Sequence, residues 1–306
     1  MTDVRAKREE RLGRRGWSVR GRQARAAYIL LLPALLFYLL VWAAPLVRTI
    51  QIMFYRWNFL TPPVFVGLQN FRVVFADPHF WLALANTFAF ALIAVPVGLF
   101  LSFVLALGVF HLSHGKAFYR TVFFATSLTP PVIASIIFKF WFNPEVGLIN
   151  DFLYSLGITG PPWLSDQYWG MTAVIIVSVW AGLGYNMVVY LAGLSEVDPS
   201  LYEAARIDGA GFWQAVRYVT VPLIQPTVLF TTVIGFIGGL QVFAQVLIIT
   251  NGGPARETET ALLYIYREAF DYQDVGGATI LAFVLFCFIL VVTLFWMKIL
   301  DRGTSV

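Results

Sequence analysis

The side chains best suited to bind a small polar ligand lie inside two strongly apolar stretches of the chain. They are aromatic, amide and glycine residues, namely Trp180, Gly182, Tyr185, Asn186, Gln241 and Gln245. Aromatic faces with amide donors and acceptors suit a neutral sugar, whose ring faces are apolar and whose hydroxyls form hydrogen bonds. Polar groups are costly in lipid and usually face a cavity or another helix. The sequence therefore predicts a substrate pathway here, with helix packing as the alternative for each residue.

A polar loop, residues 196–226, has the pattern of a short capped helix. Asp198 can accept hydrogen bonds from the free amides at the start of a helix, Pro199 suits its first position, and Gly209 suits the stop. An isolated helix of two or three turns is only marginally stable in water, so this one must pack against its own protein or against a partner. A second short helix is expected over residues 212–219.

No catalytic or metal-binding pattern accompanies these residues. The sequence lacks a GxxxxGK[ST] phosphate loop, so we expect no ATP hydrolysis by this chain. His111 and His114 share a loop without an HExxH pattern, and no nucleophile is paired with a base. The single cysteine, Cys287, excludes an internal disulfide and a cysteine-based zinc site. These features predict a protein that is not an enzyme, with no catalytic residues, no metal ligands and no cofactor bound by this chain.

The composition indicates which elements position the candidate residues. Of 306 residues, 59% are hydrophobic and 12% are charged, against about 25% charged in soluble proteins. A bilayer accommodates such a chain at roughly 20 residues per helical crossing. We therefore expect an all-α integral membrane protein with six transmembrane helices, over residues 27–52, 84–109, 121–141, 171–194, 226–250 and 278–300.

The basic residues indicate the orientation of these helices. Many of the 21 Lys and Arg residues precede the first apolar stretch, so residues 1–26 are predicted to be a basic cytoplasmic tail. Alternating the sides from there, and counting the tail, places 15 of the 21 basic residues inside and six outside. This predicts that both termini are cytoplasmic, and that the tail is a topogenic signal rather than an arm that binds nucleic acid.

The 196–226 loop carries a motif with a wider spacing. Glu203, Ala204 and Ala205 are followed after three residues by Gly209, and after nine more by a Val-Thr-Val-Pro segment that ends at Pro222. This pattern resembles the EAA loop of permease subunits in binding-protein-dependent ABC importers. That family has Ile and Leu where this chain has the two valines, which are conservative departures.

Other segments resemble the first of the two homologous permeases in the carbohydrate-uptake branch of that family, the maltose, lactose and glycerol 3-phosphate type. The similar segments are residues 67–71, 77–81, 86–87, 120–124, 142–150, 250–254, 264–266 and 269–270. The resemblance covers nearly the whole chain after the tail. It implies the type I importer transmembrane fold for a permease domain over residues 27–302.

The resemblance also implies a function and partners. The chain would be the transmembrane permease subunit of an ATP-driven importer of mono- or oligosaccharides in a prokaryotic plasma membrane. Its partners would be a second homologous permease, a cytoplasmic ATPase dimer that holds ATP and Mg, an extracytoplasmic sugar-binding protein and membrane lipid, with no nucleic acid. The residues that couple it to the ATPase would be Glu203, Ala204, Ala205, Asp208, Gly209 and Pro222.

An ion-coupled secondary transporter is the alternative function. Such carriers usually bury charged residues in the middle of a span, where they bind protons or sodium. Here the charged residues lie at span ends or in loops, and Lys139 is close to an outer edge. The alternative also leaves the spacing of the EAA-like loop unexplained.

Overall fold

The structure is a computed structural model that describes residue 21 and residues 23–301. Four of its helices are long and apolar enough to cross a membrane: Gln23–Ile52, α4 (Pro78–His111), α8 (Gln167–Ser195) and Val275–Lys298 within α15 (Val275–Asp301). The first of these includes a π-helical segment, η1 (Leu39–Ala43), and α2 (Ala44–Ile52). The predicted all-α membrane fold is confirmed. The predicted tail, residues 1–26, and residue 302 lie mostly outside the described residues.

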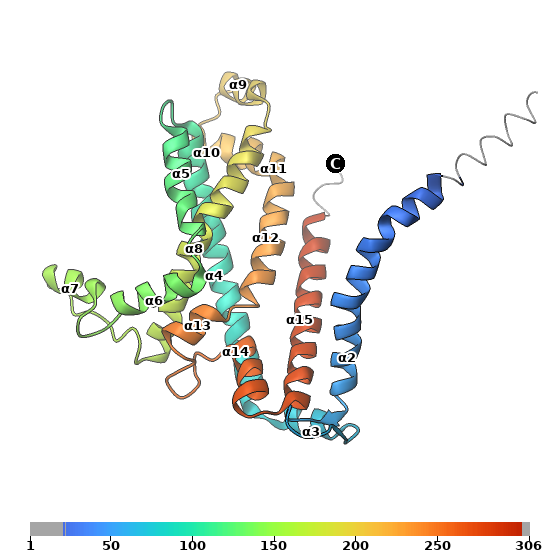
Figure 1. The fold of residues 1–306 in the computed structure, drawn as a ribbon. Coiled ribbons are helices and arrows are strands. Elements are labelled where there is room, and N and C mark those ends of the chain that lie inside the picture. The colour runs from blue at the N-terminus through green and yellow to red at the C-terminus, as the bar shows by residue number, and fades with distance from the viewer. Residues whose placement is uncertain (1–20, 22, 302–306) are drawn as a thin grey trace, which may run out of the picture.

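The third predicted span is not one straight helix, so that expectation was wrong. The segment consists of α5 (Lys116–Ser127) and α6 (Pro131–Trp141), which meet at an angle of 89°. Pro130 and Pro131 lie at the junction, and Pro130 has extended backbone angles. A proline removes a helical hydrogen bond and disfavours helical geometry in the residue before it, so the helix ends here. In Figure 1, α6 runs across the direction of α5.

The fifth predicted span, residues 226–250, is also interrupted. A short series of helical segments, α10 (Phe212–Ala215), η2 (Val216–Thr220) and α11 (Val221–Leu223), approaches α12 (Gln225–Gly239) at 73°. After Gly239 the chain is irregular over residues 240–243, and α13 (Ala244–Ile249) follows. Two consecutive glycines at the end of α12 lower its helix propensity. The expected helix over residues 212–219 is present as α10 and η2.

Shorter elements occupy the two ends of the molecule. At one end α9 (Pro199–Ile207) lies apart from the main helices, and α15 ends on the same side (Figure 1). The opposite end carries α3 (Gln69–Ala76), α14 (Ala261–Tyr266) and the π-helix η3 (Arg267–Asp271). An antiparallel pair of two-residue strands, β1 (Tyr55–Arg56) and β2 (Val64–Phe65), and α7 (Leu148–Ser155) complete the described elements.

Small residues allow the central helices to approach closely. A Cβ atom at Gly235 or Gly239 of α12 would stand 2.9 or 2.8 Å from Val95 of α4. This pair therefore mediates helix packing, as its four-residue spacing suggests. On α8, Gly193 faces Thr227 of α12, where a Cβ would come within 2.5 Å of the hydroxyl. The same helices are joined by a hydrogen bond from the Thr231 hydroxyl to the Tyr190 hydroxyl at 3.0 Å.

Gly184 of α8 provides a test of this packing. A Cβ there would collide with the backbone of Phe123 in α5, which cannot rotate away as a side chain could. We expect Gly184→Ala to destabilise the purified protein by about 1–3 kcal/mol, the usual cost of overpacking. Gly108→Ala is the matched control, because nothing lies within 4 Å of a Cβ at Gly108 on α4. Thermal unfolding in detergent measures both, and equal midpoints would contradict the packing.

Candidate functional site

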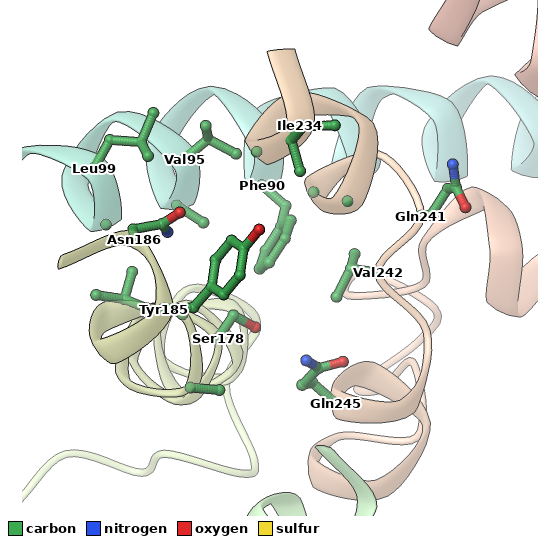
Figure 2. Close-up of a pocket in the computed structure, with 18 residues that line it drawn as sticks. Phe90, Val95, Leu99, Ser178, Tyr185, Asn186, Ile234, Gln241, Val242 and Gln245 are labelled. Atoms are coloured by element: carbon green, nitrogen blue, oxygen red, sulfur yellow. The ribbon is translucent and has the colours of Figure 1, made fainter. Parts of the chain in front are cut away.

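A cavity of about 410 Å³ lies between α4, α8, α12 and the interrupted segment that leads into α13 (Figure 2). Its walls are largely apolar, and its polar side chains come from two sides. Tyr185 and Asn186 project from α8, and Gln241 and Gln245 come from the segment after α12. None of the described residues that line it is charged. The cavity therefore offers aromatic, hydroxyl and amide groups without a fixed charge, which suits a neutral polar ligand.

The structure brings five of the six predicted pathway residues to this cavity: Gly182, Tyr185, Asn186, Gln241 and Gln245. Trp180 is not among its lining residues. Its ring packs on Phe138 of α6, with 5.1 Å between ring centroids. The helical period explains the difference, since positions 182, 185 and 186 share one face of α8 and position 180 points to another. Trp180 thus joins the apolar packing between α8 and α6.

The two glutamines reach the cavity by a different route from the one predicted. The predicted span, residues 226–250, would have placed both on one uninterrupted helix. Gln241 instead lies in the irregular segment 240–243, and Gln245 lies on α13. In Figure 2 Gln245 is below Val242, and Gln241 is near the edge of the view. The interruption of the helix therefore decides where both amides lie.

Ser178 was not predicted and belongs with these residues. It lines the cavity from α8, and its hydroxyl is buried without a hydrogen-bond partner among the described residues. Buried polar groups in proteins almost always have a partner, so this hydroxyl is available to a ligand or to water. Its spacing of four from Gly182 and seven from Tyr185 is the signal that places it on the same helix face.

At the other candidate site, α9 is built as the sequence predicted. The Asp198 carboxylate accepts a hydrogen bond of 2.9 Å from the Ser200 amide, which lowers the pKa of Asp198 below its ordinary value. Pro199 occupies the first helical position. Gly209 has a φ of +78°, a left-handed conformation that favours glycine and ends the helix. The capped helix is therefore confirmed from its first residue to its stop.

The predicted coupling residues mostly face solvent. Glu203, Ala204, Asp208 and Gly209 are exposed and Ala205 is half-buried. Pro222 is exposed and lies apart from them, in α11. The Tyr202 hydroxyl lies 3.1 Å from the Thr220 hydroxyl, which ties α9 to η2.

Large apolar side chains are exposed beside this helix. Ile207 is 87% exposed and Trp213 is 72% exposed. Exposed apolar side chains with polar residues around them are typical of interaction sites. The end of the molecule that carries α9 therefore has the character of a docking surface.

The fold and these two sites define a class of protein. A helical membrane protein with a largely apolar cavity that carries uncharged polar groups, and with a protruding capped helix at one end, has the features of a solute permease. Residues 94–306 match the family described as binding-protein-dependent transport system inner membrane component. The chain belongs to this family, which decides against an ion-coupled secondary transporter.

Individual relatives agree with this assignment. The chain is 32% identical over 281 residues to the probable ABC transporter permease protein YurN of Bacillus subtilis, covering 90% of this chain and 96% of YurN. It is 39% identical over 217 residues to the lactose transport system permease protein LacF of Rhizobium radiobacter, covering 68% and 72% of the two chains. The relatives are named as permeases, not as enzymes.

A solved structure has the same fold. The crystal structure of a bacterial ABC transporter involved in the import of the acidic polysaccharide alginate superposes with a TM-score of 0.80. The match covers 93% of this chain and 98% of that one at 24% identity. The transmembrane fold of ABC importers is therefore the fold of this chain.

Proposed function

We propose that this chain is one transmembrane subunit of an ATP-driven importer of a neutral mono- or oligosaccharide. The observation that carries the proposal is the chemistry of the cavity. It combines the Tyr185 ring and hydroxyl with the Asn186 and Gln245 amides, and no charged residue is among its described lining residues. A sugar phosphate or a uronic acid would need a cation for its anionic group. The name of LacF, a lactose permease, supports the same class of substrate.

The partners follow from the same proposal. A second homologous permease would supply the other half of the path, and an extracytoplasmic binding protein would deliver the sugar at the α3 end. A cytoplasmic ATPase dimer, which holds ATP and Mg, would dock on the coupling loop 196–226 at the α9 end. Both termini would then be cytoplasmic, together with the basic tail. This arrangement supports alternating access driven from α9.

The cavity assignment predicts which substitution alters sugar affinity. Tyr185→Phe removes only the hydroxyl from the cavity wall, and we expect the apparent KM for uptake to rise about two- to tenfold, the usual worth of one hydrogen bond. Trp180→Phe is the control, because Trp180 packs on Phe138 and should leave KM unchanged. Uptake of radiolabelled lactose, arabinose oligosaccharides and glycerol 3-phosphate into vesicles with the complete transporter measures both. Transport of glycerol 3-phosphate alone would contradict a neutral substrate.

The coupling assignment predicts a second effect. Glu203 is exposed on α9, and no ion pair to it is found among the described residues, so it is free to pair with a basic group of the ATPase. Glu203→Lys would place like charges together, and we expect the ATPase to be lost on purification and uptake to fall at least tenfold. Glu145→Lys, an exposed change in the loop between α6 and α7 and away from α9, should retain the ATPase. Equal recovery of the ATPase with both variants would refute the docking surface.

A further inference from the structure

The irregular segment between α12 and α13, residues 240–243, places two residues in the cavity wall. Gln241 and Val242 both line the cavity and both belong to this segment. Peptide groups outside a helix need another hydrogen-bond partner when they are buried. The Val242 carbonyl has one, because the Thr260 hydroxyl donates to it at 3.1 Å. Thr260 is 0% exposed and lies 18 residues further along the chain.

Thr260 belongs to the 250–261 loop, which consists of the residues between α13 and α14 and the first residue of α14, and this loop is attached to α4. The Asn86 amide donates to the carbonyls of Glu257 and Glu259 at 2.9 and 3.1 Å. The neighbouring Thr87 hydroxyl accepts a hydrogen bond of 2.7 Å from the backbone amide of Ala261. The end of the loop is therefore fixed to the same helix that supplies Phe90 and Val95 to the cavity.

A buried carboxylate holds the two ends of this loop together. Glu259 is 1% exposed, and its carboxylate lies 2.5 Å from an Arg267 nitrogen and 3.7 Å from Nε of Arg256. Arg267 also donates to the Asn251 carbonyl at 2.8 Å. A buried charge is tolerated only when it is paired, and removal of one partner is strongly destabilising. Glu259 and Arg267 thus connect the start of the loop with its end.

The loop also contacts the beginning of α8. A Cβ at Gly170 would stand 3.2 Å from Thr250 and 3.3 Å from Thr258. The Thr258 hydroxyl in turn donates to the Gly253 carbonyl at 2.7 Å. The loop is therefore packed on α8 and hydrogen-bonded to α4, the two helices that form one side of the cavity.

We propose that the 250–261 loop is a clip that positions the cavity wall, with Thr260 as the positioning residue for segment 240–243 and Glu259 as the residue that keeps the clip closed. The clip would set the place of Gln241 and Val242 relative to Tyr185. Its role in sugar selection rests on the function proposed above. Its geometric role is independent of the substrate and is tested without one.

The test measures the accessibility of the cavity wall. Val242→Cys, at a side chain that is 5% exposed, is introduced together with Cys287→Ala, and the assembled transporter in vesicles is labelled with a sulfonated methanethiosulfonate reagent. Thr260→Val keeps the shape of the side chain and removes the hydrogen bond to Val242. We expect it to accelerate labelling about fivefold or more, since losing one buried hydrogen bond shifts a local equilibrium by that order. An unchanged or slower rate would overturn the proposal.

Thr279→Val is the matched control. Its hydroxyl also donates to a backbone carbonyl, that of Gly276 at 2.8 Å, but it lies on α15 and does not line the cavity. We expect this variant to be labelled at the same rate as the transporter with an unchanged Thr279 and Thr260. Acceleration by Thr279→Val equal to that by Thr260→Val would mean that the effect is general loosening, and it would contradict a specific clip.

Glu259→Gln tests the closed state of the clip through a second residue. It should also accelerate labelling, and the Thr260→Val/Glu259→Gln double variant should add little, because both act through one unit. Additive effects would contradict a single clip. If Glu259→Gln fails to assemble, the Thr260→Val comparison remains.

Sugar uptake separates the clip from the proposed pathway. Faster labelling in Thr260→Val with a raised KM supports both proposals. Faster labelling with unchanged uptake of every sugar supports the clip and contradicts the pathway along this cavity.

Discussion

The hydrocarbon core of a bilayer holds no water to pair with peptide groups, so each span must satisfy its backbone within the protein. In this chain α4, α8 and α15 do so as long helices. The two bent segments meet the same requirement in other ways. The junction of α5 and α6 lies at Pro130 and Pro131, neither of which has an amide hydrogen to satisfy. The segment after α12 depends on a side chain, because the Thr260 hydroxyl serves the Val242 carbonyl. Departures from helical geometry are thus confined to places where the rest of the fold compensates for them.

The cavity exists partly because glycines, which have no side chain, form part of its wall. Five glycines line it, namely Gly98, Gly182, Gly235, Gly238 and Gly239. Two of them, Gly235 and Gly239, also bring α12 close to Val95 of α4. A Cβ at Gly238 would meet nothing within 4 Å. The same residue type therefore draws α12 towards α4 on one face of the helix and leaves space on another.

Part of the fold and of the candidate site could be predicted from the sequence. Local signals predicted α9 through its Asp198 cap and Gly209 stop, and the residue types inside an apolar stretch predicted Gly182, Tyr185 and Asn186 as pathway residues. Residue types alone grouped Trp180 with these residues, although the helical period places its side chain on another face of α8. The bonds from Asn86 to residues 257 and 259 were not predictable, because they join segments more than 170 positions apart and no local pattern carries such information. The interruption after Gly239 has a local signal in its two consecutive glycines, but the bond from Thr260 that supports it has none.

The arrangement of the two ends has a mechanical consequence. The helix α9 directly follows α8, and α8 is joined to α12 by the Tyr190–Thr231 hydrogen bond and by the contact of Gly193 with Thr227. A displacement of α9 would therefore be transmitted to α8 and α12 together. The 250–261 loop holds segment 240–243 from the opposite end, through Thr260. Relative motion between α12 and the loop must then be absorbed in segment 240–243, where the backbone is not helical. Gln241 and Val242 line the cavity at this point, so the motion that the ATPase would drive would also change the contacts offered to a substrate on the proposed pathway.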